Sequence, residues 1–357
     1  MDAKFWRGRR VFVTGHTGFK GGWLCLWLHR LGADVAGFAL APDTDPHFFG
    51  AADVAVATRS TLGDIRDARA LERAMRAHEP EFVFHLAAQA LVLRSYAQPA
   101  ETFAANVMGT VNVLEAARCC RSVRAVVIVT SDKCYENRDS KRRYREADPL
   151  GGRDPYSASK ACAEIAARAW RESFLNTRRA PAVATARAGN VLGGGDWAQD
   201  RLLPDLVRAF ASDAVAEVRN PAATRPWQHV LDPLAGYLML ARSLRQKGRT
   251  YAGAWNFGPG PRQARDVEWI ADAACKSWGG SARWKLARQK ARPHEARLLG
   301  LDATKARREL GWRPRLTTSS AVDWAVEWYK GYSRDPASAR RLTDRQIASY
   351  QEGRALG

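Results

Sequence analysis

Short β-rich apolar runs alternate with longer segments of helical periodicity through the first half of the chain. Residues 11–14 form one such run, and residues 21–31 carry apolar side chains at helical spacing before Gly32 ends the segment. The same patterns predict strands over residues 35–39, 82–86, 125–130 and 181–186, and helices over residues 67–77, 102–118 and 154–173. In the last of these helices, Asp154 is expected as the N-cap and Pro155 at the first helical position.

This alternation of strand and helix is typical of an α/β protein with a doubly wound parallel sheet of the Rossmann type, covered by helices on both faces. After Arg187 the periodicity breaks up. Glycines at residues 193–195 and several prolines separate shorter elements of mixed type. We therefore expect a smaller, mixed C-terminal lobe that closes over the first, followed by a peripheral helix or tail.

Charge and cysteine content narrow the class of protein. The formal net charge of +19 is compatible with anionic partners, or with basic residues spread over a solvated surface. The basic residues are dispersed, and neither a zinc-finger spacing nor an RNA-binding signature is present, so we expect no nucleic-acid partner. No run approaches about 18 consecutive apolar residues, so we expect no membrane span. Six cysteines without a C-x-x-C pair or a histidine cluster predict reduced thiols, no metal and a cytoplasmic protein.

A glycine-rich loop joins the first predicted strand to the first predicted helix. Its glycines are Gly15, Gly18 and Gly21, with Thr17, Phe19 and Lys20 between them. A backbone of small residues lets a pyrophosphate approach, and the helix N-terminus supplies free N–H groups. Because the loop follows a strand and opens a helix, it predicts a dinucleotide site.

The second predicted strand bears on the choice of dinucleotide. It ends at residues 37–40 without an acidic residue for the adenosine ribose, and Asp43 comes slightly late. No arginine stands in place to favour a 2′-phosphate, so NAD is preferred over NADP. Asp64 and Ile65 are expected near the adenine, although Asp64 is equally well placed as a cap before the helix at Asp67.

Tyr156 and Lys160 lie one helical turn apart, on the same face of the predicted helix. A neighbouring ammonium stabilises a phenolate, which makes Tyr156 a credible acid–base group for an alcohol. Ser131, Asp132 and Lys133 follow a buried strand at the sheet edge where doubly wound folds place their ligands. We expect Ser131 to bind the same substrate hydroxyl as Tyr156.

With these residues the chain resembles the extended short-chain dehydrogenase/reductase family and, within it, the CDP-glucose 4,6-dehydratases. The likeness is carried by residues 12–21, 85–89, 129–137, 154–160, 186–191, 193–197 and 225–230. The glycine loop and the Tyr-x-x-x-Lys pair are shared by many reductases and epimerases, whereas Ser131-Asp132-Lys133 and the Gly-Gly-Gly-Asp-Trp run are narrower. The resemblance implies further cofactor contacts at Leu86, Ala87, Ala88, Gln89 and Asn106.

The resemblance also implies the reaction, an internal redox dehydration. Tyr156 takes the proton of the sugar 4-hydroxyl while a hydride leaves C4 for bound NAD; water is lost across C5–C6, and the hydride returns to C6. Lys160 holds the nicotinamide ribose and tunes Tyr156. Asp132 is the expected acid for the departing 6-hydroxyl and Lys133 the expected base for the C5 proton, where dTDP-glucose dehydratases carry Asp-Glu.

The smaller lobe is expected to bind the nucleotide diphosphate of CDP-glucose. The substrate-binding candidates implied by the resemblance are Asn190, Arg201, Arg219, Arg225 and Arg292. The expected division is an NAD-binding domain at 1–187 with a return segment at 228–257, a substrate lobe at 188–227 and 258–335, and a C-terminal tail at 336–357. The family likeness also implies a homo-oligomer, a dimer or a tetramer.

Alternatives stay open from the sequence. A 4-epimerase, or a 4,6-dehydratase for another nucleotide sugar, needs the same Ser131, Tyr156 and NAD, and an epimerase does not need Asp132 and Lys133. A non-catalytic protein that has kept the dinucleotide fold is the alternative of another class. The basic loop at 138–145 differs from the family pattern, and is either a solvated loop or an element that attracts the anionic substrate.

Overall fold

The computed structural model describes residues 2–140, 142–177, 179–287 and 298–354. Its centre is a seven-stranded sheet in which every neighbouring pair of strands is parallel. From one edge to the other the strands are β11 (Gly253–Phe257), β6 (Ala182–Ala188), β5 (Ala125–Val129), β4 (Phe82–His85), β1 (Arg10–Thr14), β2 (Asp34–Ala39) and β3 (Arg59–Leu62). The predicted doubly wound sheet of the Rossmann type is confirmed.

The order of the strands creates a switch point beside β1. The chain winds outward from β1 through β2 to β3, and then returns to the other side of β1 to build β4, β5 and β6. Loops that leave the carboxyl ends of β1 and β4 therefore run in opposite directions and open a crevice between them, which is where such folds bind ligands.

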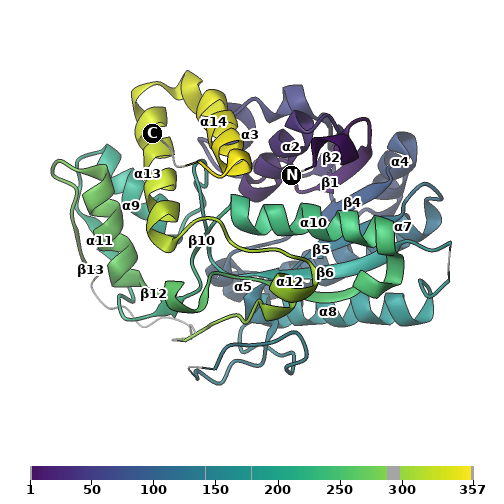
Figure 1. Ribbon diagram of the computed structural model, residues 1–357. Coiled ribbons are helices and arrows are strands. Elements are labelled where there is room, and N and C mark those ends of the chain that lie inside the picture. Colours follow the sequence, from purple (N-terminus) through teal and green to yellow (C-terminus); the bar gives the residue numbers. More distant parts are fainter. Residues whose placement is uncertain (1, 141, 178, 288–297, 355–357) are drawn as a thin grey trace.

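Helices cover both faces of the sheet (Figure 1). Helices α2 (Phe19–Arg30) and α10 (Leu231–Lys247) lie on one face, and α4 (Ala68–His78), α7 (Gly109–Cys119) and α8 (Pro155–Ser173) lie on the other. Val11 and Val13 of β1 pack into the first of these two cores, and Phe12 packs into the second. This alternation follows from the two-residue period of a strand and explains why the central strands have apolar residues on both faces.

The predicted helix at 102–118 is longer than expected and is not uniform. It consists of α6 (Pro99–Phe103), a π-helical turn η2 (Ala104–Met108) and α7. Apolar periodicity does not reveal a π turn, because the turn inserts one residue without changing which side chains are apolar. The turn carries Asn106, which is buried.

The start of α8 agrees with the prediction. The edge strand β3, in contrast, was not predicted. Asp154 caps α8 by accepting from the Ser157 amide at 2.9 Å, and Pro155 is its first residue, as expected. All four residues of β3 are exposed, so this strand carries no apolar signal and is formed only by pairing with β2.

Short elements follow β6 and build the smaller lobe. They are β7 (Val191–Leu192), α9 (Leu202–Ala211), β8 (Ala216–Val218), β9 (Thr224–Arg225), β10 (Gln228–His229), η5 (Pro261–Gln263), β12 (Arg265–Asp266), α11 (Val267–Trp278) and β13 (Trp284–Leu286). Strands β7 and β10, β9 and β12, and β8 and β13 form three small pairs. Apolar side chains of this lobe join the core beneath α2 and α10. The boundaries of the two lobes stay a prediction.

The C-terminal segment, which was expected as a peripheral helix or tail, is helical, and one side of its last helix is buried. After α12 (Thr304–Glu309), the chain forms α13 (Thr318–Arg334), η6 (Pro336–Ser338) and α14 (Ala339–Glu352). Helix α14 packs against α2 and α13. The Tyr350 ring lies 5.5 Å from the Trp27 ring, and the Tyr350 hydroxyl donates to Asp232 at 2.8 Å. Apolar residues are few in this segment, so the sequence pattern did not indicate that it packs against α2.

The remaining short elements connect the larger ones. They are α1 (Ala3–Trp6), α3 (Phe48–Ala51), η1 (Val54–Ala57), α5 (Val92–Ala97), η3 (Asp132–Cys134) and η4 (Gly248–Tyr251). Among the described residues, none of the helices is both long and apolar enough to cross a membrane. All six cysteines are free thiols.

Candidate active site

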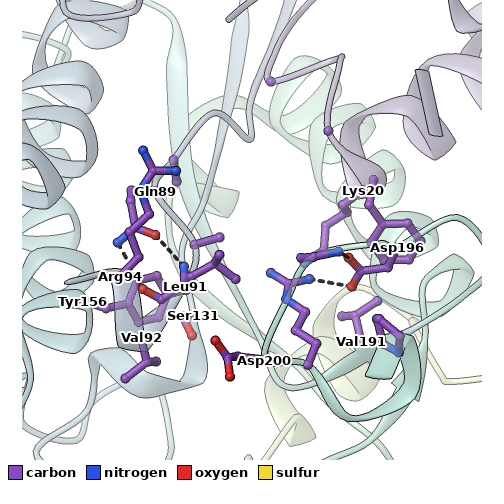
Figure 2. Close-up of a pocket in the computed structure, with 18 of the residues that line it drawn as sticks. Lys20, Gln89, Leu91, Val92, Arg94, Ser131, Tyr156, Val191, Asp196 and Asp200 are labelled. Atoms are coloured by element: carbon purple, nitrogen blue, oxygen red, sulfur yellow. Dashed lines mark hydrogen bonds and ion pairs between the residues drawn. The ribbon is translucent and has the colours of Figure 1, made fainter. Parts of the chain in front are cut away.

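A cavity of about 650 Å³ opens at the carboxyl ends of the central strands, at the switch point of the sheet. Its walls come from the loops after β1, β4, β5 and β6 and from the smaller lobe. Figure 2 shows Gln89, Ser131 and Tyr156 on one side of it, and Lys20 and Asp196 on the other. Among the site residues predicted from the sequence, two do not appear in this lining: Asn106 lies behind it, and Arg292 falls outside the described residues.

Two glycines of the loop after β1 are fixed by close backbone contacts. Gly15 has a φ of +78°, and a Cβ there would lie 2.6 Å from the Ala87 amide nitrogen. A Cβ on Gly21 would lie 2.0 Å from the Gly15 carbonyl oxygen. The loop therefore folds against itself and against the end of β4, and only glycine fits at these two positions.

Gly18 has a different surrounding and faces open space. A Cβ on Gly18 would meet only the Gly15 carbonyl oxygen, at 3.5 Å. Gly18 is also the N-cap of α2, and no side chain caps that helix end. The first amides of α2 are thus left for another partner, and an open glycine at an uncapped helix start fits a pyrophosphate.

Gln89 and Asn106 form a bracket at the end of β4. Asn106 accepts from the Gln89 amide at 2.8 Å and donates to the Gln89 carbonyl at 3.0 Å and to Ser159 Oγ at 2.8 Å. The Asn106 side chain fixes the wall residue Gln89 to helix α8, and its expected contact with the cofactor stays a prediction. The π turn that carries Asn106 places it between these two segments.

Two arginines line the cavity near β2 and β3 and were not predicted. Arg66 donates to Asp64 Oδ2 at 2.5 and 2.8 Å, and these bonds hold the pKa of Asp64 below its usual range. Arg94 lies 3.5 Å from Asp43. Asp64 is therefore committed to Arg66, and Asp67 is the residue that caps α4. Neither arginine was predicted, because Arg66 lies in a turn and Arg94 on the short helix α5, and no recognised motif spacing includes them.

Ser131, Asp132 and Lys133 follow β5 and share one small network. Ser131 caps the short helix η3, and its Oγ accepts from the Lys133 amide at 3.2 Å. The same hydroxyl donates to Asp132 Oδ1 at 3.0 Å. Asp132 is 2 % exposed, and its Oδ2 has no hydrogen-bond partner among the described residues. Burial raises the pKa of Asp132, with Lys133 acting more weakly in the other direction.

Tyr156 and Lys160 lie on the first two turns of α8, both buried in the wall of the cavity. Burial raises the pKa of Tyr156 to about 12, and its neighbours Ser131 and Arg201 work in the opposite direction. Burial also lowers the pKa of Lys160 to about 8. Desolvation is thus the largest influence on the phenol, and the expected effect of Lys160 on Tyr156 stays a prediction.

Lys20 is a second lysine with a perturbed pKa in the cavity. It follows Gly18 by two residues, and its amine lies 5.8 Å from the Tyr237 ring centroid. Burial lowers the pKa of Lys20 to about 7, and the cations of Arg201 and Lys160 lower it further, whereas Asp132 and Asp196 raise it. Lys20 thus connects the glycine loop electrostatically to the triplet after β5.

The arginines predicted for the smaller lobe line the opposite wall. Arg201 donates to Asp196 Oδ2 at 2.7 Å, and Arg219 pairs with Asp200. Two further predicted residues line the same part of the cavity, the buried Arg225 and Asn190. Asp196 belongs to the Gly-Gly-Gly-Asp-Trp run and was not among the predicted site residues. No motif spacing indicates its pair with Arg201, because the loop before α9 brings the two residues together.

The described residues hold no group of three or more His, Cys, Asp or Glu side chains that could bind a metal ion. The two histidines nearest the loop are buried. Burial lowers the pKa of His16 to about 4 and that of His85 to about 3. Both rings are engaged by hydroxyls, His16 by Ser60 at 2.7 Å and His85 by Thr14 at 2.7 Å, and they brace the glycine loop.

Comparison with known proteins agrees with this geometry. The family model of GDP-mannose 4,6 dehydratase matches residues 12–323. A curated CDP-glucose 4,6-dehydratase of Salmonella typhimurium is 46 % identical over 98 % of this chain and 99 % of its own. A dTDP-glucose 4,6-dehydratase of Xanthomonas campestris is 27 % identical over 89 % of this chain and 92 % of its own.

Solved structures with the same fold include dehydratases and epimerases. A dTDP-glucose 4,6-dehydratase from Streptomyces venezuelae, with NAD and TYD bound, has a TM-score of 0.75 at 27 % identity, covering 92 % of this chain and 99 % of its own. A UDP-glucose 4-epimerase from Thermus thermophilus in complex with NAD has a TM-score of 0.78 at 23 % identity, covering 90 % and 99 %. The chain belongs to the GDP-mannose 4,6 dehydratase family.

Proposed function

We propose that this protein is an NAD-dependent lyase that converts CDP-D-glucose to CDP-4-dehydro-6-deoxy-D-glucose. The observation that carries the proposal is the meeting of Ser131, Asp132, Tyr156 and Lys160 in the cavity beside an uncapped glycine loop. The 46 % identity to a CDP-glucose 4,6-dehydratase over nearly the whole chain supports the nucleotide and the reaction.

The residues around the glycine loop fit NAD. The open Gly18 and the uncapped start of α2 suit the pyrophosphate, and Lys160 suits a ribose hydroxyl. When bound, NAD supplies a hydride acceptor for C4, a hydride donor for C6 and a cationic ring near the phenol. Arg66 is engaged by Asp64, and Arg94 by Asp43, so both cations already have carboxylate partners, which favours NAD over NADP.

Oxidation at C4 needs a base for the 4-hydroxyl, and Tyr156 takes this role. Burial raises its pKa to about 12 and favours the protonated phenol, whereas positive charge near the ring lowers this pKa and favours the phenolate. Ser131 orients the 4-hydroxyl toward Tyr156. Lys160, whose pKa lies near 8, supplies a cation in the same wall.

Elimination across C5–C6 needs an acid and a base on neighbouring groups. Asp132 suits the acid, because burial raises its pKa and favours the protonated carboxyl, and because Oδ2 has no partner among the described residues. The 6-hydroxyl leaves as water after it takes this proton. Lys133 takes the C5 proton and returns it to C5 when the hydride reaches C6.

These assignments fix the direction of the pH dependence. The reaction needs a protonated Asp132, so the rate falls as the pH rises through the raised pKa of Asp132. The expected outcome is a loss of kcat on the alkaline side of the profile, measured at saturating CDP-glucose.

The experiment that tests the function is product analysis by NMR. Purified protein with NAD is incubated separately with CDP-, dTDP-, GDP- and UDP-glucose. A 4-keto-6-deoxy product from CDP-glucose alone supports both reaction and nucleotide. A C4 epimer, or turnover of another nucleotide sugar in place of CDP-glucose, contradicts the specific proposal, and no turnover of any of the four favours a binding protein.

We also propose that the protein is a homo-oligomer. Large apolar side chains are exposed on neighbouring helices of one face, Met108 on η2 and Ile165 and Phe174 at α8 and its end. Exposed apolar side chains on adjacent helices are typical of a contact between copies. Light scattering of the wild type and of Met108→Glu with Ile165→Glu tests this, and a wild-type monomer contradicts it.

For location, we propose the cytoplasm. All six cysteines are free thiols, and thiols persist in a reducing compartment. The test is fractionation of the source cells, in which activity outside the cytoplasmic fraction contradicts the proposal.

A further inference from the structure

A fully buried ion pair lies directly behind the triplet, outside the lining of the cavity. Glu164 of α8 and Arg187 of β6 are joined at 2.8 Å, and their side chains are 2 % and 3 % exposed. Removing two charges from water is costly, so such a pair is weak evidence for stability on its own. The hydrogen bonds of Glu164 and Arg187 to neighbouring residues indicate a further role for the pair.

The carboxylate of Glu164 fixes the residue that precedes the triplet. Thr130 Oγ1 donates to Glu164 Oε1 at 2.5 Å, and Thr185 Oγ1 donates to Glu164 Oε2 at 2.6 Å. Thr130 stands between β5 and Ser131. The carboxylate therefore ties the end of β5 to helix α8 and to the neighbouring strand β6.

The guanidinium of Arg187 fixes the residue that follows the short helix η3. One nitrogen donates to the Tyr135 hydroxyl at 2.8 Å and to the Glu146 carbonyl at 3.2 Å. The guanidinium carbon lies 4.8 Å from the Tyr135 ring centroid. The Tyr135 hydroxyl in turn donates to Asn256 at 2.7 Å. Residues 131–134 are thus held at both ends by one ion pair.

The pair also acts on Lys160, one helical turn before Glu164. Burial lowers the pKa of Lys160, whereas Cys134 and Glu164 raise it. The other titratable groups that interact with Lys160 are Lys20 on α2 and His85 on β4. His85 is neutral at physiological pH because burial lowers its pKa to about 3. Glu164 is therefore a source of negative charge that favours the ammonium form.

We propose that Glu164 and Arg187 are positioning residues of the dehydratase, and that their buried pair sets the geometry of Ser131 and Asp132 through Thr130 and Tyr135. This rests on the proposed function. A buried network of this kind places reacting groups without touching the substrate, and small displacements of such groups are costly in rate. Glu164 of this pair also raises the pKa of Lys160, one helical turn away on α8.

The test replaces Glu164 by glutamine, which keeps the shape and the acceptor oxygen and removes the charge. In Glu164→Gln, kcat is expected to fall by about 10- to 100-fold with KM for CDP-glucose little changed, because the substrate contacts remain. The matched control is Glu115→Gln, the same change in the exposed Glu115–Arg118 pair of α7, which should leave kcat unchanged. A Glu164→Gln variant with wild-type kcat overturns the proposal.

A second readout needs no substrate. With isotope-labelled lysine and Lys160→Arg for assignment, NMR titration follows the Lys160 amine. Its pKa is expected to fall in Glu164→Gln and to stay unchanged in Glu115→Gln, and an unchanged titration in both overturns the electrostatic part. If the wild type does not turn over CDP-glucose, the proposed function fails, while this titration still decides the role of the pair.

Thr130→Val covers the case in which Glu164→Gln does not fold. This variant removes only the hydroxyl bond to Glu164 and leaves the ion pair in place. Its kcat is expected to fall while the Lys160 titration stays at the wild-type value. A Thr130→Val variant with wild-type kcat contradicts positioning through the end of β5.

Discussion

Individual side chains around the cavity are governed more by burial than by their charged neighbours. Desolvation is the largest influence on Asp132, Tyr156, Lys160 and Lys20, and in each case it favours the neutral form. Desolvation disfavours whichever form is charged, so acids and bases shift in opposite directions. Charged groups of NAD and of the substrate are therefore expected to shift these side chains toward their charged forms when they bind.

Proton uptake on binding follows from this at Lys20. The amine has a pKa of about 7, and an anionic pyrophosphate placed at the glycine loop favours its protonated form. At pH 7.5, NAD binding should take up protons, measured by calorimetry in buffers of different ionisation enthalpy. Lys20→Met should reduce the uptake, and an equal uptake in wild type and variant would assign it to another group.

Asp132 separates dehydration from oxidation. In Asp132→Asn the acid for the departing 6-hydroxyl is absent, so formation of the 4-keto-6-deoxy product should fall by about 10²- to 10⁴-fold. Oxidation at C4 does not use Asp132, so the absorbance at 340 nm that reports the reduction of NAD should persist. Retention of most of the overall activity would point instead to an epimerase, which has no elimination step.

At the scale of elements, the glycine loop depends on one contact between its ends. A methyl group on Gly21 would lie 2.0 Å from the Gly15 carbonyl oxygen, so the start of α2 has to move away from the loop. We expect Gly21→Ala to weaken NAD binding at least about 10-fold, which corresponds to 1.4 kcal/mol. Gly260→Ala, where the nearest atom is the flexible Gln263 Cγ at 3.7 Å, is the control.

For the wild type and both variants, calorimetry measures the NAD affinity and thermal unfolding measures the melting temperature. Equal NAD affinity in Gly21→Ala and wild type would show that the loop accommodates the methyl group. A loss of affinity with a melting temperature near that of Gly260→Ala locates the effect at the loop and not in the overall fold.

Elements with strong local signals were predictable from the sequence, and elements formed by pairing were not. Strands β1, β4 and β5 have continuous apolar runs because both their faces are covered, and Asp154 with Pro155 marks the start of α8 by local chemistry. The exposed strand β3 has no such pattern and exists because β2 offers it an edge.

The same distinction applies to the candidate site. Motif spacing was enough to bring Ser131, Tyr156 and Lys160 to one cavity. It was not enough for Asn106, whose place behind the wall depends on a π turn, or for the pair of Asp196 with Arg201, which depends on the fold of the smaller lobe. Protonation was the least predictable property, because the burial of each group is set by segments distant in sequence.

At the scale of the whole molecule, a buried carboxyl joins the last helix to the core. Asp232 Oδ1 accepts from the Tyr350 hydroxyl at 2.8 Å and from the Arg315 amide at 2.7 Å. Burial raises the pKa of Asp232 to about 7. In the unfolded chain this carboxyl ionises at lower pH, near its ordinary value of about 4.

The folded protein should therefore lose stability as the pH rises from about 4 through about 7, because only the unfolded state gains the charge freely. Asp232→Asn removes this titration and keeps an acceptor for both donors. The fall in the free energy of unfolding between pH 5 and pH 8, on the order of a few kcal/mol in the wild type, should be smaller in the variant. Urea unfolding at the two pH values measures it, and parallel falls would contradict the assignment.

The contact between α2 and α14 also has a consequence for biosynthesis. Trp27 of α2 is fully buried and meets Tyr350, which is added to the growing chain more than three hundred residues later. While the ribosome is still translating, an early sheet with α2 in place has an apolar helix surface that its final cover has not yet reached. Until α14 has been synthesised and has packed against α2, this exposed apolar surface favours aggregation of the nascent chain.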